Sequence, residues 1–263
     1  MLQRCLSVML SLVMVISFVC FAEGMPPAGM PSIEAILQKM QDNVNISTDA
    51  RARVTLTQQK PSQGVKNFEM MYYRRDKDDA FLIVFSAPEA EKGNGYLRIG
   101  DNFWMYRRNT RTFQHINRDE SIGGSDAHGE DFETRKLTEL YQAAKDSSGK
   151  ELIREEKLGA IPVYRLEVKG KVNDVSYPYR VFWVRTDNFL QLKDEAYSSS
   201  KTLMATSYYL KYTMVLGKYV PIKQIFVDEF EKGNKTIVEI SGIVTGKLDD
   251  QIFTKAYLEN LSK

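Results

Sequence analysis

Cysteine and histidine are scarce in this sequence: its 263 residues contain two of each. Both cysteines, Cys5 and Cys20, lie within the first 24 residues. Beyond them the chain has no disulfide and no thiolate chemistry. Two histidines without a cysteine are too few for an ordinary zinc site. The glycine-rich motifs that cradle phosphates are also missing, so we expect neither a metal nor a cofactor.

Long hydrophobic runs are confined to the N-terminus. One apolar run follows Arg4 and spans about residues 5–21, and the small residues Ala22 and Gly24 come after it. This order is typical of a cleaved secretory signal peptide. The run is short for a membrane span, which needs about 20 residues, so an uncleaved anchor is the less favoured alternative. We predict a signal peptide over residues 1–24, a flexible leader over 25–31 and a single domain over 32–263.

The end of this N-terminal run allows a second interpretation. The segment "SFVC" could be a loose lipobox, in which Cys20 would become an acylated N-terminus. Val19 precedes this cysteine, where such sites prefer a small residue. Cleavage by an ordinary signal peptidase is therefore the main prediction, and a lipid anchor at Cys20 stays an alternative.

An excess of charge of either sign is missing as well. The chain has 36 Lys and Arg against 34 Asp and Glu, a net charge of +2. This balance gives no reason to expect a nucleic acid as partner. Aromatic residues are plentiful, with 14 Tyr and 13 Phe, which suits a fold rich in strands.

The pattern of apolar residues predicts an α+β fold. Ser32 precedes an apolar stripe at helical spacing, which predicts a helix over 33–44. Further helices are expected over 130–142 and 249–261. Most other segments alternate like strands, and short turns join them. We expect about ten or eleven antiparallel strands in a strongly curved sheet, an unclosed β-barrel, with helices covering its concave face.

Three of the expected strands are apolar on both faces: residues 80–87, 103–106 and 181–184. A sheet with one face in water should instead alternate apolar and polar residues. Two explanations are open. Ordinary core could cover both faces, or one face could border an apolar cavity between the sheet and its helices.

The segment "GGSDAHGED" (123–131) gathers the few residues that could carry chemistry. Ser125, Asp126 and His128 could in principle form a hydrolytic triad, but the G-x-S-x-G elbow is missing. The carboxylates could form a weak Ca²⁺ site, although their spacing does not match an EF-hand. The favoured interpretation is a polar turn that caps the following helix. His115, the other histidine, is expected to be structural within a strand.

Several motifs follow one another in the order seen in a known family. They are "YYRRD" (72–76), "FSAPEAEKGNGYLRIGDNFWMYRRNTRTFQHI" (85–116), "GGSDAHGEDF" (123–132), "FWVRTDNFLQLKDEAY" (182–197), "GKYVPIKQIFVD" (217–228) and "IFTKAYLENL" (252–261). In this order and spacing the chain resembles the LolA-like family of outer-membrane lipoprotein-sorting proteins. It departs from the family in "YRRN", where relatives often have a proline, and in "SDAHGED", which lacks the usual aromatic residues.

The resemblance implies a non-enzymatic periplasmic carrier. Family members hold the acyl chains of lipoproteins in an apolar interior and carry them towards the outer membrane. An inner-membrane complex loads the carrier and an outer-membrane acceptor unloads it. The implied ligand is a lipoprotein acyl chain, or a phospholipid in a more distant branch. The resemblance also implies that Arg75, or its neighbour Arg74, is the arginine that holds the lid closed.

A cavity for an acyl chain needs long apolar side chains. Sequence does not tell which sheet face is concave, so the candidates come from strands of both orientations. They are Phe68, Met70, Tyr72, Phe81, Ile83, Phe85, Trp104, Tyr106 and Trp183. Two other functions remain open: a lipid-ester hydrolase, with or without a bound Ca²⁺, and an accessory subunit of a membrane lipid-transport complex.

Overall fold

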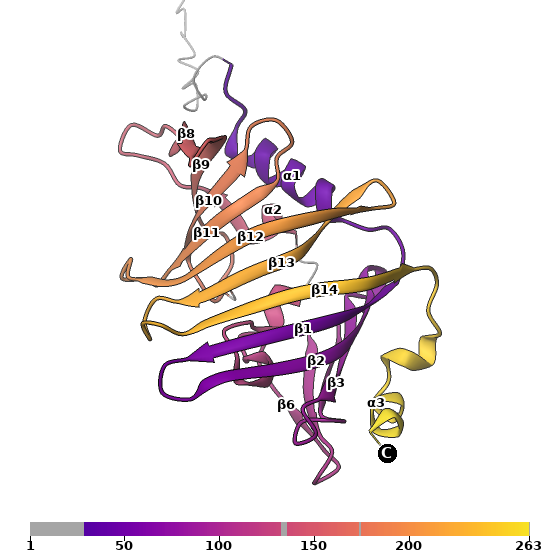
Figure 1. The fold of residues 1–263 in the computed structure, drawn as a ribbon. Coiled ribbons are helices and arrows are strands. Elements are labelled where there is room, and N and C mark those ends of the chain that lie inside the picture. Colours follow the sequence, from indigo (N-terminus) through magenta and orange to yellow (C-terminus); the bar gives the residue numbers. More distant parts are fainter. Residues whose placement is uncertain (1–28, 133–135, 174, 263) are drawn as a thin grey trace, which may run out of the picture.

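The structure is a computed structural model that describes residues 29–132, 136–173 and 175–262 (Figure 1). The predicted signal peptide, Cys20 and most of the predicted leader lie outside these residues. Within the described residues, no helix has the length and apolar character needed to cross a membrane.

Fourteen strands within the described residues form one antiparallel sheet, which is unclosed and curls strongly (Figure 1). Its order is β6-β5-β4-β3-β2-β1-β14-β13-β12-β11-β10-β9-β7, and β8 pairs with β9. The strands are β1 (Ala50–Lys60), β2 (Gly64–Arg75), β3 (Ala80–Ala87), β4 (Gly95–Ile99), β5 (Asn102–Arg107), β6 (Thr112–His115), β7 (Tyr141–Ala143), β8 (Ile153–Leu158), β9 (Ile161–Gly170), β10 (Tyr179–Arg185), β11 (Gln191–Tyr197), β12 (Leu203–Val215), β13 (Lys218–Asp228) and β14 (Lys235–Thr245).

The sheet has more strands than the ten or eleven expected. One of the additional strands, β7, takes the place of the end of the predicted second helix. Helix α2 (Leu137–Leu140) is a single turn, not the helix predicted over 130–142. The chain leaves it at Tyr141, which pairs with Gly170 as the start of β7. The Tyr141 hydroxyl then donates to the carbonyl of Tyr177 at 3.1 Å. Pairing with the sheet edge thus overrides the local helical pattern.

Helix α1 (Ile33–Val44) begins where the sequence predicted, because the Ser32 hydroxyl accepts a bond from the Ala35 N–H at 3.2 Å. It covers the concave side of the half of the sheet that contains β7 to β11. Its buried stripe packs against side chains of that half: Ile33, Ile36, Leu37 and Met40 contact a cluster with Tyr164, Leu166, Phe182 and Val184.

The C-terminal segment packs on the opposite, convex face. A 3-10 turn, η4 (Asp250–Phe253), leads into α3 (Lys255–Leu261), which lies beside β3 in Figure 1. Leu258 of α3 is fully buried against Leu82, Leu97 and Tyr106. Two of the three described helices therefore cover the concave face, and the third covers the convex face.

The strands that are apolar on both faces are explained by this arrangement. Phe81, Ile83 and Phe85 of β3 point into the concave core, and Leu82 and Val84 point to α3. In the β1–β6 half of the sheet, the segment between β6 and α2 fills the concave side. It contributes Ile116, Ile122, Ala127 and Phe132 to a cluster with these side chains. Both faces of β3 are ordinary core, and the space for a cavity lies between this filled region and α1.

Candidate functional site

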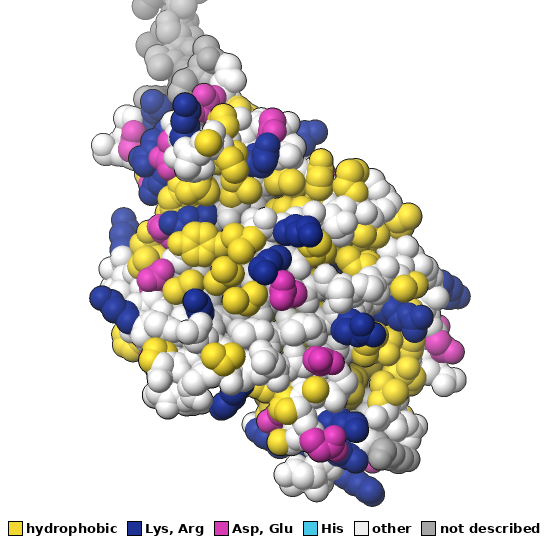
Figure 2. All heavy atoms as spheres, viewed as in Figure 1, with side chains coloured by type: hydrophobic (Ala, Val, Ile, Leu, Met, Phe, Trp, Pro, Cys, Tyr) yellow, Lys and Arg dark blue, Asp and Glu magenta, His cyan; other side chains and the backbone are white. Residues whose placement is uncertain are grey.

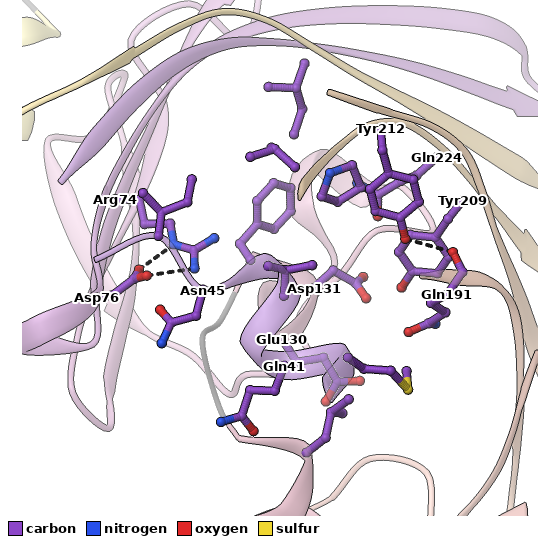
Figure 3. Close-up of a pocket in the computed structure, with 18 of the residues that line it drawn as sticks. Gln41, Asn45, Arg74, Asp76, Glu130, Asp131, Gln191, Tyr209, Tyr212 and Gln224 are labelled. Carbon is purple, nitrogen blue, oxygen red and sulfur yellow. Dashed lines mark hydrogen bonds and ion pairs between the residues drawn. The ribbon is translucent and has the colours of Figure 1, made fainter. Parts of the chain in front are cut away.

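A cavity of about 450 Å³ lies between the concave face of the sheet and the two helices α1 and α2 (Figure 3). This volume is within the range of small-molecule pockets in proteins, about 300–1,000 Å³. Apolar side chains form much of its wall. They are Met40 and Val44 of α1, Leu137 and Leu140 of α2, and Phe226, Val238, Ile240 and Ile243 of β13 and β14.

Alternation in β14 supplies one apolar row of the cavity wall. The inward residues Val238 and Ile240 alternate with outward Glu239, so both apolar side chains face the cavity. The segment that fills the other half ends at Phe132, which contacts the rings of Tyr72 and Phe81 at centroid distances of 5.6 and 6.3 Å. Phe132 and Tyr72 therefore form the wall between the cavity and the filled half.

Polar groups stand at two places on the cavity wall. At the end of β2, Arg74 forms a two-pronged ion pair with Asp76, with Nη2 and Oδ2 2.9 Å apart (Figure 3). The pair neutralises both charges locally. This part of the cavity wall is therefore polar but carries little net charge.

The second polar group centres on Arg180 of β10. Its Nη2 donates to Asp194 Oδ1 at 2.7 Å, and Gln191 Nε2 donates to Asp194 Oδ2 at 2.6 Å. Burial lowers the pKa of Arg180, but Asp194 and Tyr141 more than offset this, and the net pKa rises. The guanidinium therefore keeps its charge beside the apolar wall.

Two tyrosines and one carboxylate complete this side. The Tyr212 hydroxyl donates to the Gln191 carbonyl at 2.7 Å, and burial raises the pKa values of Tyr209 and Tyr212, so both stay neutral. Asp131 lies on the side of Tyr209 and Gln191 (Figure 3). Desolvation raises the pKa of Asp131 to about 6, although its side chain keeps solvent exposure and His128 opposes the shift. The backbone N–H of His128 donates to the Asp131 carboxylate at 2.8 Å.

The sequence candidates for lipid contact separate into three groups. Tyr72 lines the cavity. Five others share its face of the sheet but are buried in the filled half: Phe68, Met70, Phe81, Ile83 and Phe85. They do not line the cavity, because the segment between β6 and α2 covers them.

The remaining candidates lie on the convex face. Tyr106 packs against Leu258 of α3, and Trp104 lies under the Lys255 ammonium, 4.2 Å from its ring centroid. Trp183 donates from Nε1 to Glu156 at 2.6 Å within another outward cluster. The period-two alternation of a strand places these three side chains away from the cavity.

Arg75 also points away from the cavity. It donates to Asp49 at 3.0 Å, to Asp250 at 2.7 Å and to the Leu248 carbonyl at 2.6 Å. Its guanidinium lies 4.5 Å from the ring centroid of Phe253. Arg75 therefore ties the C-terminal segment to the sheet, and Arg74 is the arginine of this pair that faces the cavity.

Most of the cavity wall was not predicted from the sequence. The additional lining residues come from α1, α2 and the C-terminal strands, above all Met40, Phe226 and Ile240, together with Arg180. The alternation of β14 was a usable signal, since Val238 and Ile240 share one face. Nothing in sequence told which half of the sheet a loop would fill.

The loop with Ser125, Asp126 and His128 is a turn held by hydrogen bonds to its own backbone and to β14. The Ser125 hydroxyl donates to the Ala127 carbonyl at 3.3 Å, and Asp126 accepts from the Thr236 hydroxyl at 2.8 Å. The described residues contain no group of three or more His, Cys, Asp or Glu side chains placed to hold a metal ion.

Solved structures with the same fold include proteins from three bacteria. A LolA superfamily protein from Nitrosomonas europaea matches with a TM-score of 0.72 and 22% identity, over 87% of this chain and 100% of that chain. A putative outer membrane lipoprotein-sorting protein domain from Vibrio parahaemolyticus matches with a TM-score of 0.74 and 19% identity, over 86% and 97%. A DUF1329 family protein from Desulfovibrio piger matches with a TM-score of 0.74 and 22% identity, over 87% and 100%.

Comparisons of sequence add one match. A family model described as "Uncharacterized protein" matches residues 77–260, well over half of the chain. Among curated proteins, the comparison finds no match. The structures establish the LolA-like fold that the sequence motifs predicted, and identities near 20% establish no more than that fold.

Proposed function

Since the chain belongs to the family whose model matches residues 77–260, and since it has the LolA-like fold, we propose that it is a periplasmic lipid carrier. In this proposal the cavity between the sheet and α1 holds acyl chains of lipoproteins or of other lipids. The carrier shuttles them towards the outer membrane and catalyses no reaction. The observation that carries the proposal is the apolar cavity of about 450 Å³.

The cost of exposing an acyl chain explains why a carrier needs this cavity. Each CH₂ group that leaves a bilayer for water costs about 0.8 kcal/mol, so a sixteen-carbon chain costs about 12 kcal/mol. A shallow groove offsets little of this cost. A cavity with apolar walls on the sheet and on both helices removes much more of the chain from water.

We assign chain contact to the apolar cavity wall: Met40, Val44, Tyr72, Leu140, Phe226, Val238, Ile240 and Ile243. We assign the polar groups around Arg180 and Tyr209 to binding of the ester or amide end of the ligand. We assign Phe68, Phe81 and Phe85 to the core, because the filled half of the sheet buries them.

Export and exchange partners complete the proposal. We propose that residues 1–24 form the export signal, that 25–31 form a leader and that residues 32–263 form the carrier domain. An inner-membrane complex would load the carrier and an outer-membrane acceptor would receive the lipid. The structural relatives support this role, because two of them are described as a LolA superfamily protein and as a putative lipoprotein-sorting domain.

The proposal is tested by filling the cavity. Ile240→Trp places an indole in the apolar wall, and Ile237→Trp places the same side chain on the opposite face of the same strand. We expect Ile240→Trp to weaken binding of a fluorescent fatty-acid probe by at least about tenfold, which corresponds to 1.4 kcal/mol. Ile237→Trp should bind like the unmodified protein. Equal binding by all three proteins would place the acyl chain outside this cavity.

A further inference from the structure

The turn between β12 and β13 carries an exposed leucine in an unfavourable backbone conformation. Leu216 and Gly217 form its two central residues, with φ angles of 51° and 75°. Positive φ at both positions is the pattern of a type I′ hairpin turn, which favours Asn, Asp or Gly. Leu216 nevertheless occupies the first position, and 66% of its surface is exposed. Neither local conformation nor burial explains a leucine here.

A second exposed apolar side chain stands beside it. Met214 is 61% exposed and lies two residues after Tyr212, which lines the cavity. Alternate residues of a strand share a face, so Met214, which pairs with Tyr219, continues the cavity side of β12 towards the turn. We call Met214, Val215 and Leu216 the apolar tip.

The apolar tip adjoins one end of the cavity. Lys218, directly after the turn, donates from Nζ to the Asp42 carbonyl of α1 at 2.7 Å. Two residues further along α1, Val44 both lines the cavity and is 36% exposed. Figure 1 shows this hairpin ending beside α1, and Figure 2 shows hydrophobic side chains gathered on the same edge. A chain that leaves the cavity past Val44 therefore meets the apolar tip.

Near its turn, this hairpin carries charge of one sign. Residues 203–227 contain three lysines, Lys211, Lys218 and Lys223, and no Asp or Glu, although Lys223 pairs with Glu239 of β14 at 2.9 Å. Lys211 and Lys218 flank the apolar tip. The hairpin between β13 and β14 differs: Phe230 is 74% exposed there but stands between Glu229 and Glu231. Of these two hairpins, only the one at the cavity end has exposed apolar side chains flanked by lysines and not by acidic residues.

We propose that the apolar tip inserts into the surface of an anionic lipid bilayer, so that the adjacent end of the cavity faces the membrane. Leu216 and Met214 would enter the boundary between headgroups and acyl chains. Lys211 would keep its ammonium group among the anionic headgroups while its stem lies along the apolar layer, and Lys218 would hold the turn against α1. This inference rests on the proposed carrier function, because it supplies the dry path by which an acyl chain enters or leaves.

The test is co-flotation of the full mature chain with lipid vesicles. The protein is expressed from a precursor that carries Cys20→Ser, so that no acyl anchor can form at this position. We expect binding to vesicles of phosphatidylcholine with phosphatidylglycerol, and much weaker binding to phosphatidylcholine alone. The double variant Met214→Gln/Leu216→Asn should weaken that binding by at least about tenfold. Asn suits the positive φ of position 216, so this variant should keep its Tm and fold.

Controls separate this inference from the carrier function. Phe230→Asn removes a more exposed ring from the other hairpin and should leave vesicle binding unchanged. Lys211→Gln should weaken the preference for phosphatidylglycerol, and added salt should do the same. The double variant should still bind the fatty-acid probe, because neither residue lines the cavity. The inference is overturned if the unmodified protein does not bind vesicles, or if the double variant binds them as well as the unmodified protein does. Either result would count against it even if the cavity binds the probe.

Discussion

Arg180 of β10 donates to Asp194 of the neighbouring strand β11 at 2.7 Å, and Asp194 is fully buried. Gln191 supplies a second bond to the same carboxylate. The pair stands where the cavity wall changes from apolar to polar. Its geometry therefore matters both to the stability of the sheet and to the charge that a bound lipid meets.

Asp194→Ala should destabilise the protein strongly. It leaves Arg180 charged and without its carboxylate partner next to an apolar wall. Removing one partner of a buried pair costs about 3–5 kcal/mol. Arg180 keeps some exposure, so we expect about 3 kcal/mol by urea unfolding. Asp187→Ala, which breaks the exposed pair with Arg185, should cost much less. Equal costs for both variants would contradict this account of the pair.

Arg75→Met should release the C-terminal segment from the sheet. The substitution removes the bonds to Asp49, Asp250 and the Leu248 carbonyl, but keeps an apolar side chain against Phe253. We expect faster hydrogen exchange in residues 248–261 and little change in β12 and β13. Asp250→Asn should have a smaller effect, because Asp250 is mostly exposed. Unchanged exchange in Arg75→Met would show that α3 holds itself in place.

Asp131 should make stability depend on pH. Desolvation raises its pKa to about 6 from an ordinary value of 3.8, so the folded state binds a proton more tightly than the unfolded state. Because the side chain keeps solvent exposure, we expect the change in stability to be small. The contribution to stability is complete below about pH 3.8 and is lost as the pH rises through about 6. Asp131→Asn should flatten this part of the stability profile, as measured by urea unfolding between pH 4 and pH 8. A profile that keeps its slope would assign the titration to another group.

Phe132→Ala should enlarge the cavity. The ring separates the cavity from the filled half, where it contacts Tyr72 and Phe81. Its removal joins the cavity to the space that the ring vacates. We expect competition assays with the fatty-acid probe to show a shift in preference towards longer chains. Phe230→Ala, at the exposed hairpin, should leave the preference unchanged. A shift towards shorter chains would mean that the filled half collapses into the cavity.

The fold followed from sequence to a large extent, because its signals are local. Ser32 and the stripe on α1 predicted the first helix, and alternation predicted most strands. The prediction of the second helix was wrong because Tyr141 pairs with β9, a contact that is distant in sequence. The helix expected over 249–261 is divided at Thr254, whose hydroxyl caps α3 by accepting from the Tyr257 N–H at 3.1 Å.

The site followed from sequence to a much smaller extent. Phe81 and Tyr72 are both aromatic, both on inward positions, and only Tyr72 lines the cavity. The difference comes from the segment that ends at Phe132, and its path is a tertiary property. Trp104 and Trp183 looked like good candidates because their strands are apolar on both faces. Alternation alone does not tell which of two apolar faces is concave.

Native mass spectrometry of the protein, purified from its own cells without detergent, tests the central claim most directly. The account predicts an added mass of an acylated amphiphile, and predicts that Ile240→Trp lowers the occupied fraction while Ile237→Trp does not. A protein that carries no amphiphile and takes up none from vesicles would contradict it, because the cavity beneath α1 would then shelter no hydrocarbon.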